Sequence, residues 1–194
     1  MIPGLENIKE DLETIIEDEL SRIGLLYRLF SRTKTRLSLD RKILRKDKYE
    51  VDGTKVQDMI GLRVITYFKD DIEIAYSALK SKFKFCDETI DEPELTVFKP
   101  KRTNIICQYD YEQAEIFEDI KNVSEDKNLL LVDNTFELQF RTILSEGWHE
   151  IDHNLRYKTK EDWSNYPENE RLLNGIYASL ETSDQTLKSL FDEL

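Results

Sequence analysis

The hydrophobic period changes partway along residues 136–158, and this change constrains the fold more than any other feature. In residues 136–141 apolar and polar side chains alternate, which indicates a strand with one buried face. From residue 143 onward the apolar side chains recur at helical spacing instead. They are Leu144, Trp148, Ile151 and Leu155. A half-buried strand that runs directly into an amphipathic helix requires a layered domain with both element types.

Polar side chains gather on the other side of both elements. The alternation places Glu137, Gln139 and Arg141 on the strand face opposite the apolar one. On the helix, the side opposite the apolar stripe carries His149, His153 and Tyr157. A polar pocket between this strand and this helix is therefore expected, although a solvated strand face would look the same.

The remaining segments predict an α+β domain with a mixed sheet of about five strands flanked by helices. Strands are expected at residues 62–68, 94–98, 103–109, 129–132 and 136–141. Helices are expected at residues 5–30, 70–83, 111–121, 143–158, 172–180 and 183–191, with a short one inside the basic segment 32–48 and a loop around Pro167.

Charge is distributed unevenly. The net charge of −12, from 28 basic and 40 acidic residues, argues against a broad nucleic-acid-coating surface. Ten of the basic residues nevertheless lie between Arg22 and Lys48. Such a cluster suits a compact, highly charged ligand such as a nucleoside triphosphate, or else is a solvated helix face.

No apolar run approaches the length of a membrane span, and the N-terminus is interrupted early by charges, so no membrane partner is expected. Cys86 and Cys107 are isolated, which predicts two reduced thiols and a cytoplasmic location.

One motif suggests a metallohydrolase. His149-Glu150-Ile151-Asp152-His153 matches a zinc-protease pattern, with two histidine ligands one turn apart and Glu150 as general base. Glu168 or Glu170 would have to supply the third ligand. This interpretation leaves the polar strand face and the basic segment without a role, so it is kept as a remote alternative.

Three ordered blocks support a different interpretation. The first is Arg32-x-Lys34-x-x-x-Ser38-x-x-x-Lys42, and the second is Asp58-Met-Ile-Gly-Leu-Arg63-Val. The third comprises Glu137, Gln139, Arg141, Thr142, Trp148, Asp152, His153, Tyr157 and Lys158. Together these blocks resemble the synthetase domain of the RelA/SpoT family of bacterial alarmone synthetases.

The resemblance implies a nucleotidyltransferase-like fold and a pyrophosphokinase. Such an enzyme moves the β,γ-pyrophosphate of ATP to the ribose 3′-hydroxyl of GDP or GTP and releases AMP, which forms the (p)ppGpp signal of the stringent response. The domain division that follows is an N-terminal helix at 1–30, a synthetase core at 31–160 and C-terminal helices at 161–194. The terminal helices could pack against another copy of the chain in a homo-oligomer.

The resemblance also assigns roles. Asp58 and Glu137 would hold Mg²⁺, and Glu137 would orient the proton of the attacking hydroxyl. ATP would be bound by Arg32, Lys34, Ser38, Lys42 and Arg63. The acceptor side would comprise Gln139, Arg141, His153, Tyr157, Lys99 and Arg102. Structural roles stay open for several of these: Asp58 as a turn cap, Arg63 as an ion-pair partner, and the residues His153 and Tyr157 as helix-packing groups.

Residues 98–109 depart from the family pattern. Lys99, Pro100 and Arg102 align with the acceptor loop, but its Gly-Tyr pair and its histidine are missing. The tyrosine of that loop stacks on guanine, so a contact of about 1–3 kcal/mol is lost. The acceptor is therefore GDP or GTP held by other contacts, or a different 3′-hydroxyl such as an adenine nucleotide or an RNA 3′ end. The alternative is an inactive nucleotide-binding or regulatory module.

Overall fold

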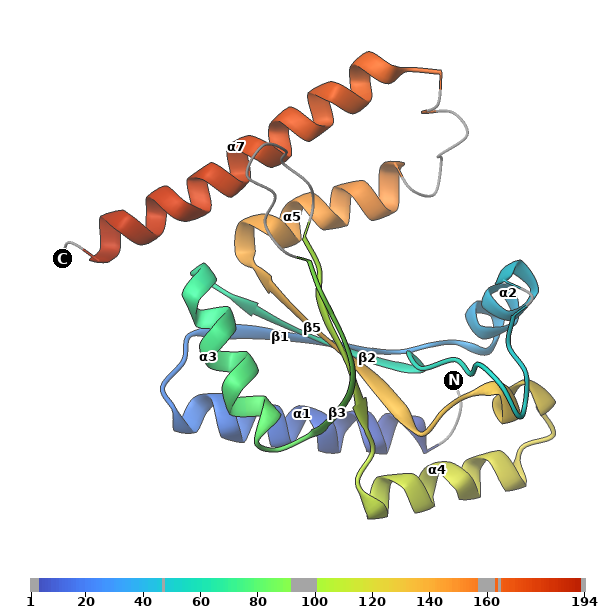
Figure 1. The fold of residues 1–194 in the computed structure, drawn as a ribbon. Coiled ribbons are helices and arrows are strands. Elements are labelled where there is room, and N and C mark those ends of the chain that lie inside the picture. The colour runs from blue at the N-terminus through green and yellow to red at the C-terminus, as the bar shows by residue number, and fades with distance from the viewer. Residues whose placement is uncertain (1–3, 47, 92–100, 157–162, 164, 193–194) are drawn as a thin grey trace.

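The computed structural model describes residues 4–46, 48–91, 101–156, 163 and 165–192, and it shows a five-stranded mixed sheet in the order β1-β2-β5-β4-β3 (Figure 1). The strands are β1 (Tyr27–Thr33), β2 (Ile60–Thr66), β3 (Lys84–Ile90), β4 (Thr103–Gln108) and β5 (Thr135–Thr142). β2 and β5 are parallel, and the other neighbouring pairs are antiparallel. The predicted α+β class with a mixed sheet is confirmed.

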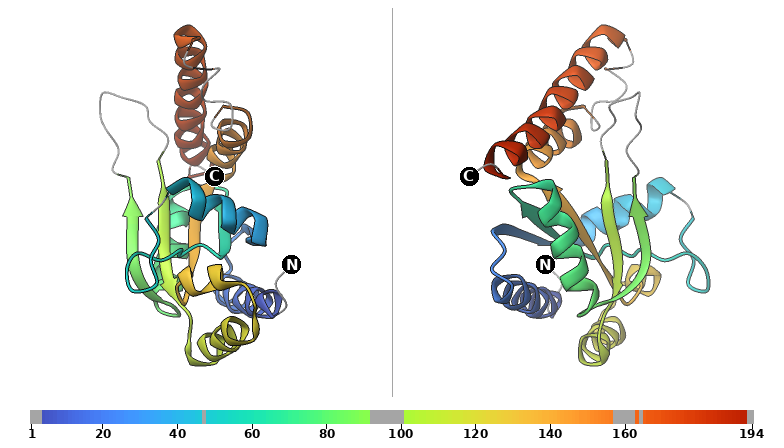
Figure 2. Two further views of the ribbon diagram at one scale, coloured as in Figure 1. Left: turned by 90° about the vertical axis from the view of Figure 1, so that its right-hand side faces the viewer. Right: turned by 60° about the vertical axis from the view of Figure 1, so that its left-hand side comes forward.

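Helices cover the sheet unequally. They are α1 (Leu5–Arg22), α2 (Arg36–Lys46), α3 (Lys69–Lys80), α4 (Tyr111–Val123), α5 (Ile143–Ile151) and α7 (Pro167–Asp192), with a 3₁₀ turn η1 (Lys127–Leu131) and a π-helical turn η2 (Asp152–Arg156). α1 and α3 pack on the sheet from one side, and α5 with α7 lies on the other side (Figure 1). α7 and α4 stand at opposite ends of the molecule, and the β3–β4 hairpin points toward the α7 end (Figure 2).

The hydrophobic core lies between the sheet and α1 and α3. α1 contributes five apolar side chains that are at most 1% exposed: Leu5, Ile8, Leu12, Ile16 and Leu20. The strands meet them with Leu62, Val64, Phe136, Leu138 and Phe140. Each such side chain stabilises the fold by about 1.5–3 kcal/mol through burial. Because side chains alternate along a strand, the intervening residues of β2 and β5 must point to the opposite, open face.

The predicted helix 5–30 is too long. α1 ends at Arg22, where Gly24 adopts φ +72° and donates its N–H to the carbonyl of Ser21. Leu25 donates to the carbonyl of Leu20, which completes a Schellman motif, and glycine is the residue that takes this left-handed conformation without strain. The chain then forms β1, so residues 27–30 belong to the sheet.

Three other element predictions need correction. Residues 129–131 belong to the turn η1, which Asp126 caps by accepting the N–H of Asn128, and Val132 forms only an isolated parallel bridge with Val56. β3 was not predicted, because an edge strand exposed on both faces lacks apolar alternation. The two C-terminal helices are one helix that begins at Pro167, a favoured first helical residue. The strand expected at 94–98 lies outside the described residues.

The predicted apolar stripe after β5 is only partly right. Trp148 is buried, but Ile151 is 51% exposed and Leu155 is 63% exposed. α5 gives way to the wider π-helical turn η2, which shifts the phase of the side chains that follow. No helix in the described ranges is long and apolar enough to cross a membrane.

Candidate functional site

Two rows of side chains cross the open face of the sheet. In the first row, Gly61 of β2 lies between Arg32 of β1 and Glu137 of β5. A Cβ at Gly61 would lie 3.8 Å from the Nε of Arg32, so glycine keeps the space between a guanidinium and a carboxylate open. This gap is the floor of a cavity of about 470 Å³.

The second row runs from Phe30 through Arg63 and Gln139 to Asn104. Phe30 is 54% exposed, which is unusual for a phenylalanine on a polar sheet face. It lines the same cavity as Arg63 and Gln139. The cavity therefore has one apolar ring among charged and amide groups, a lining that suits a flat heterocycle with polar edges.

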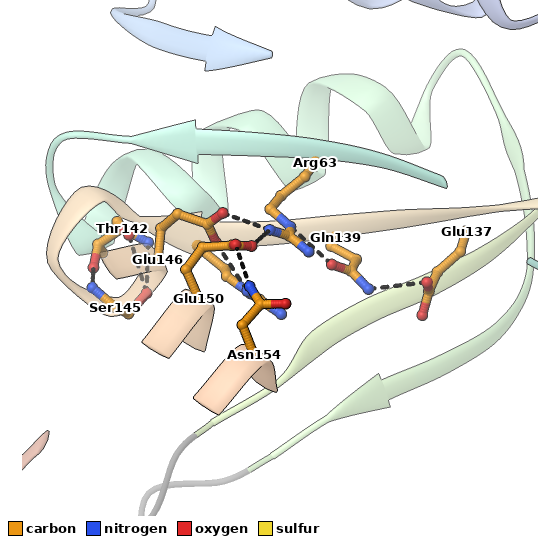
Figure 3. Close-up of polar contacts among 9 residues, drawn as sticks. Arg63, Glu137, Gln139, Thr142, Ser145, Glu146, Glu150 and Asn154 are labelled. Atoms are coloured by element: carbon orange, nitrogen blue, oxygen red, sulfur yellow. Dashed lines mark hydrogen bonds and ion pairs between the residues drawn. The ribbon is translucent and has the colours of Figure 1, made fainter. Parts of the chain in front are cut away.

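Both carboxylate oxygens of Glu137 are oriented by amides. Asn104 Nδ2 donates to Oε1 at 3.1 Å, and Gln139 Nε2 donates to Oε2 at 2.9 Å. Arg63 Nε donates to Gln139 Oε1 at 3.0 Å, which fixes the direction of the Gln139 amide (Figure 3). In the part of the chain that the structure describes, Glu137 forms no ion pair, so its charge stays available to an incoming ligand.

Arg63 is held by the carboxylates of α5. Its NH1 donates to Glu146 and, at 3.1 Å, to Glu150 (Figure 3). Arg141 NH1 donates to the other oxygen of Glu146 at 2.8 Å. Burial and the nearby charge of Arg63 lower the pKa of Arg141. The structure has a polar pocket at β5 and α5, but Glu146 and Glu150 form its α5 side in place of the expected His149.

Asp58 lies between two lysines. Lys42 Nζ donates to Oδ1 at 2.7 Å, and Lys34 Nζ donates to Oδ2 at 3.3 Å. Burial alone would raise the pKa of Asp58, but the combined attraction of the two ammonium groups outweighs it and lowers that pKa. Burial also lowers the pKa of Lys34, against the attraction of Asp58.

These lysines belong to a second cavity of about 860 Å³ that adjoins the first at Arg32. Its lining holds five basic side chains and a single carboxylate: Arg32, Lys34, Arg41, Lys42, Arg45 and Asp58. Ser38, Leu44 and His153 complete it, so α2 and η2 both border this space. A cavity of this charge is suited to a polyanion.

Local sequence fixes α2 at this place. The Thr35 hydroxyl accepts the N–H of Ser38 and caps the helix, and Ser38 in its first turn lines the basic cavity. Leu39 is fully buried, and Asp40 accepts from Asn128 at 2.7 Å, so α2 is docked on η1.

The structure thus brings most predicted site residues to the lining of the two adjoining cavities. Arg102 is not among them, because it lines neither cavity and instead contacts Asp91 at the base of the β3–β4 hairpin, with Nε 2.8 Å from Oδ2. Lys99 and Tyr157 lie outside the described residues.

The sequence did not point to Phe30, Asn104 or Glu146, and it suggested Glu150 only as the general base of the zinc-protease pattern. Phe30 was assigned to a helix, so its place on the sheet could not be foreseen. Asn104 is the second residue of β4, and a polar amide in an apolar strand was a signal that could have identified it as a site residue.

The residues of the zinc-protease pattern have other contacts. His149 packs at 5.3 Å from the Trp148 ring, and burial, aided by the charge of Arg141, lowers its pKa to about 4. Glu150 accepts from Arg63 rather than lying beside an open metal position. Across the described ranges, no three His, Cys, Asp or Glu side chains gather as metal ligands.

The fold and the site define a class of protein: α+β domains that hold a polyanion in a basic cavity beside an acidic side chain on an open sheet face. Comparison with known proteins is more specific. Residues 31–162 match the model of the region found in RelA/SpoT proteins. The chain therefore belongs to the RelA/SpoT family.

Individual relatives agree with this assignment. The chain is 28% identical over 174 residues to GTP pyrophosphokinase YjbM of Bacillus subtilis (strain 168), covering 87% of this chain and 74% of that protein. Its fold is similar to small alarmone synthetase 1 of Bacillus subtilis bound to its product pppGpp, with a TM-score of 0.72, 21% identity, and coverage of 100% and 95%. Smu.1046c of Streptococcus mutans UA159 has a TM-score of 0.73, with 17% identity and coverage of 99% and 94%.

Proposed function

We propose that this chain is an ATP-dependent pyrophosphokinase that transfers the β,γ-pyrophosphate of ATP to a ribose 3′-hydroxyl, with GDP or GTP as the first acceptors to test. The observation that carries the proposal is the amide-oriented carboxylate of Glu137 at the border of a basic cavity. Family membership and the names of the relatives support the same reaction.

The two cavities suit the two parts of the donor. The triphosphate would occupy the basic cavity, where Arg32, Lys34 and Lys42 offer charge-assisted hydrogen bonds to its oxygens. The adenine would enter the smaller cavity, where Phe30 offers a stacking surface and Arg63 a guanidinium plane. Arg32 lines both cavities and would lie near the α-phosphate that joins the two parts.

A divalent cation fits the donor set. Asp58 and Glu137 are hard oxygen ligands, and Mg²⁺ held by two carboxylates and substrate phosphates would neutralise charge on the transferred group. The contacts of Asp58 with Lys34 and Lys42 would then pass to the triphosphate, so each lysine exchanges one anion for another.

Glu137 is placed for proton handling. In the reaction, the acceptor 3′-oxygen forms a bond to the β-phosphorus, the bond from that phosphorus to the oxygen bridging it to the α-phosphorus breaks, and AMP leaves. Glu137 would accept or orient the hydroxyl proton, because its two oxygens are aimed by Asn104 and Gln139 and no ion pair with a described side chain occupies them. Arg63 keeps Gln139 in the orientation this requires.

Acceptor identity is the finer part of the proposal. The relatives named GTP pyrophosphokinase and pppGpp-bound synthetase favour a guanine nucleotide, which would make the chain a cytoplasmic alarmone synthetase. Because the Gly-Tyr pair is missing from residues 98–109, an adenine nucleotide and an RNA 3′ end remain acceptors to test. An inactive regulatory module is the alternative.

The test is incubation with Mg²⁺ and ATP labelled in the β-phosphate, together with GDP, GTP, ADP or a short RNA, followed by chromatography. Transfer of label to one acceptor with equimolar AMP supports the proposal, and Glu137→Gln should abolish both products. ATP binding by calorimetry without AMP release for any acceptor would instead establish the inactive module. Stoichiometric zinc by elemental analysis would revive the hydrolase alternative.

A further inference from the structure

Helix α7 is attached to the rest of the fold along one face. Trp148 Nε1 donates to the carbonyl of Leu173 at 3.3 Å, and the Trp148 and Tyr177 rings lie 4.9 Å apart. Farther along the helix, Asp184 accepts from Thr142 Oγ1 at 2.5 Å. α7 is therefore docked on the β5–α5 junction, beside the end of the sheet toward which the β3–β4 hairpin points (Figure 2).

Between these contacts α7 binds Lys101, which lies two residues before β4. The backbone N–H of Lys101 donates to the Tyr177 hydroxyl at 3.3 Å, and its ammonium forms an ion pair with Glu181. Tyr177 is 5% exposed, and burial raises its pKa to about 12, so its hydroxyl is protonated at neutral pH. Backbone and side chain of Lys101 are thus both held.

Lys101 precedes Asn104 by three residues, and Asn104 donates a hydrogen bond to Glu137, the proposed catalytic carboxylate. β4 begins at Thr103, and Asn104 pairs with Gln139 in the sheet register and donates to Glu137 Oε1. Where Lys101 lies therefore determines where β4 starts and how the Asn104 amide meets Glu137.

We propose that Tyr177 and Glu181 are positioning residues for the transfer reaction. They clamp Lys101 and thereby set the start of β4, the aim of Asn104 and the direction from which an acceptor approaches Glu137. This inference rests on the proposed function, since it concerns the same carboxylate. It gives α7, a helix that lines neither cavity, a role in acceptor use.

The charges support a specific clamp rather than general packing. Lys101 and Glu181 are 23% and 17% exposed at their side chains, so water competes only partly for either group. Glu181 also lies one turn from Tyr177 on the helix, so the two side chains share a face and reach the same residue. Lys101 is thus not a flexible surface lysine, and its side chain cannot move freely to compensate for a changed partner on α7.

The test uses Tyr177→Phe and Glu181→Gln in the full chain, with Glu168→Gln, an exposed glutamate on the same helix, as the matched control. Both substitutions should lower kcat/KM for the acceptor about tenfold, because a displacement well under 1 Å is costly for transfer. The Kd for ATP should stay within about twofold of the unmodified protein, because the clamp lies outside the donor cavities.

Exchanging the charges of Lys101 and Glu181 distinguishes a specific ion pair from general packing of α7. Lys101→Glu alone should reduce acceptor kcat/KM, and combination with Glu181→Lys should restore most of it. Hydrogen–deuterium exchange of residues 101–108 should rise in Tyr177→Phe and Glu181→Gln but not in the control. Unchanged kinetics and exchange in both variants, or equal losses for ATP and acceptor, would overturn the inference. If the unmodified protein transfers nothing, the proposed reaction fails, and the exchange measurement alone then decides whether the clamp exists.

Discussion

Replacing Asp58 with asparagine should weaken the ligand-free protein and strengthen its binding of metal-free ATP. Asp58 accepts from Lys42 at 2.7 Å and from Lys34 at 3.3 Å, and all three side chains are less than a quarter exposed. Without the carboxylate, two partly buried ammonium groups face each other with no anion between them. Hydrogen bonds to charged groups each contribute about 1.5–3 kcal/mol, so we expect unfolding to become easier by about 2–3 kcal/mol after partial solvent compensation.

A triphosphate restores the missing anion. In the unmodified protein ATP must first displace Asp58 from both lysines, whereas in Asp58→Asn the lysines are already available. If half of the lost stabilisation returns on binding, the Kd for ATP in EDTA should fall about tenfold, since 1.4 kcal/mol corresponds to a factor of ten. With Mg²⁺ the order reverses for catalysis: loss of a proposed metal ligand should reduce kcat about 10³-fold.

Calorimetry in EDTA and thermal unfolding with and without ATP measure these effects. Asp52→Asn, which removes the same charge from an exposed turn, is the control for net charge and should change neither quantity. Metal-free ATP that binds Asp58→Asn more weakly than the unmodified protein would refute the reasoning, because Asp58 could not then be the anion that ATP replaces.

Three further predictions address single groups. Glu137→Gln should reduce transfer about 10²–10⁴-fold, because the proton acceptor is lost. Thermal stability should change little, because glutamine keeps an oxygen that accepts from one of the two amides. A transfer rate within tenfold of normal would exclude general-base catalysis by Glu137. Phe30→Ala should raise the Kd for ATP about tenfold through lost stacking, and nucleotide titration can measure this. The fold should not be destabilised, because Phe30 is exposed. An unchanged Kd would show that adenine does not bind in the cavity that Phe30 lines. Folding lowers the pKa of His149 from its ordinary 6.5 to about 4. Between these pH values the unfolded chain therefore binds a proton at His149 that the folded chain does not. Stability should therefore decrease by about 3 kcal/mol as the pH falls from 6.5 to 4, and urea unfolding of His149→Gln should lack that slope.

The sheet face could be predicted because it depends on local alternation. Glu137, Gln139 and Arg141 share a face for the same reason that Phe136 and Leu138 are buried, and the sequence displays this period directly. The strand order could not be predicted in the same way. The apolar residues of β1 continue the spacing of the preceding helix α1, so β1 was not recognised as a strand. Only Gly24, with its left-handed conformation, marks the boundary.

Partners from distant segments were the harder part of the site. The pairing of Arg63 with Glu146 and Glu150 depends on how α5 leaves β5, and no pattern within either segment encodes that angle. Asn104 likewise acquires its role only from the register between β4 and β5. Residue types predicted which groups are chemically suitable, whereas tertiary packing determined which of them meet.

The groups that orient Glu137, the proposed catalytic carboxylate, are different residues from the Gly-Tyr pair that the acceptor loop lacks, and this bears on whether the chain is an active enzyme. The two donors that orient Glu137 are Asn104, a β4 residue within the divergent residues 98–109, and Gln139 of β5. Arg63 and the lysines around Asp58 come from β2 and from the segment after β1. On the proposed function, loss of the Gly-Tyr pair would therefore remove a surface for the acceptor base, while Glu137 and the basic cavity keep the contacts described above. An inactive module would have no need of a carboxylate held at both oxygens, so an altered acceptor preference, seen as a high KM with a preserved kcat, accounts better for the arrangement.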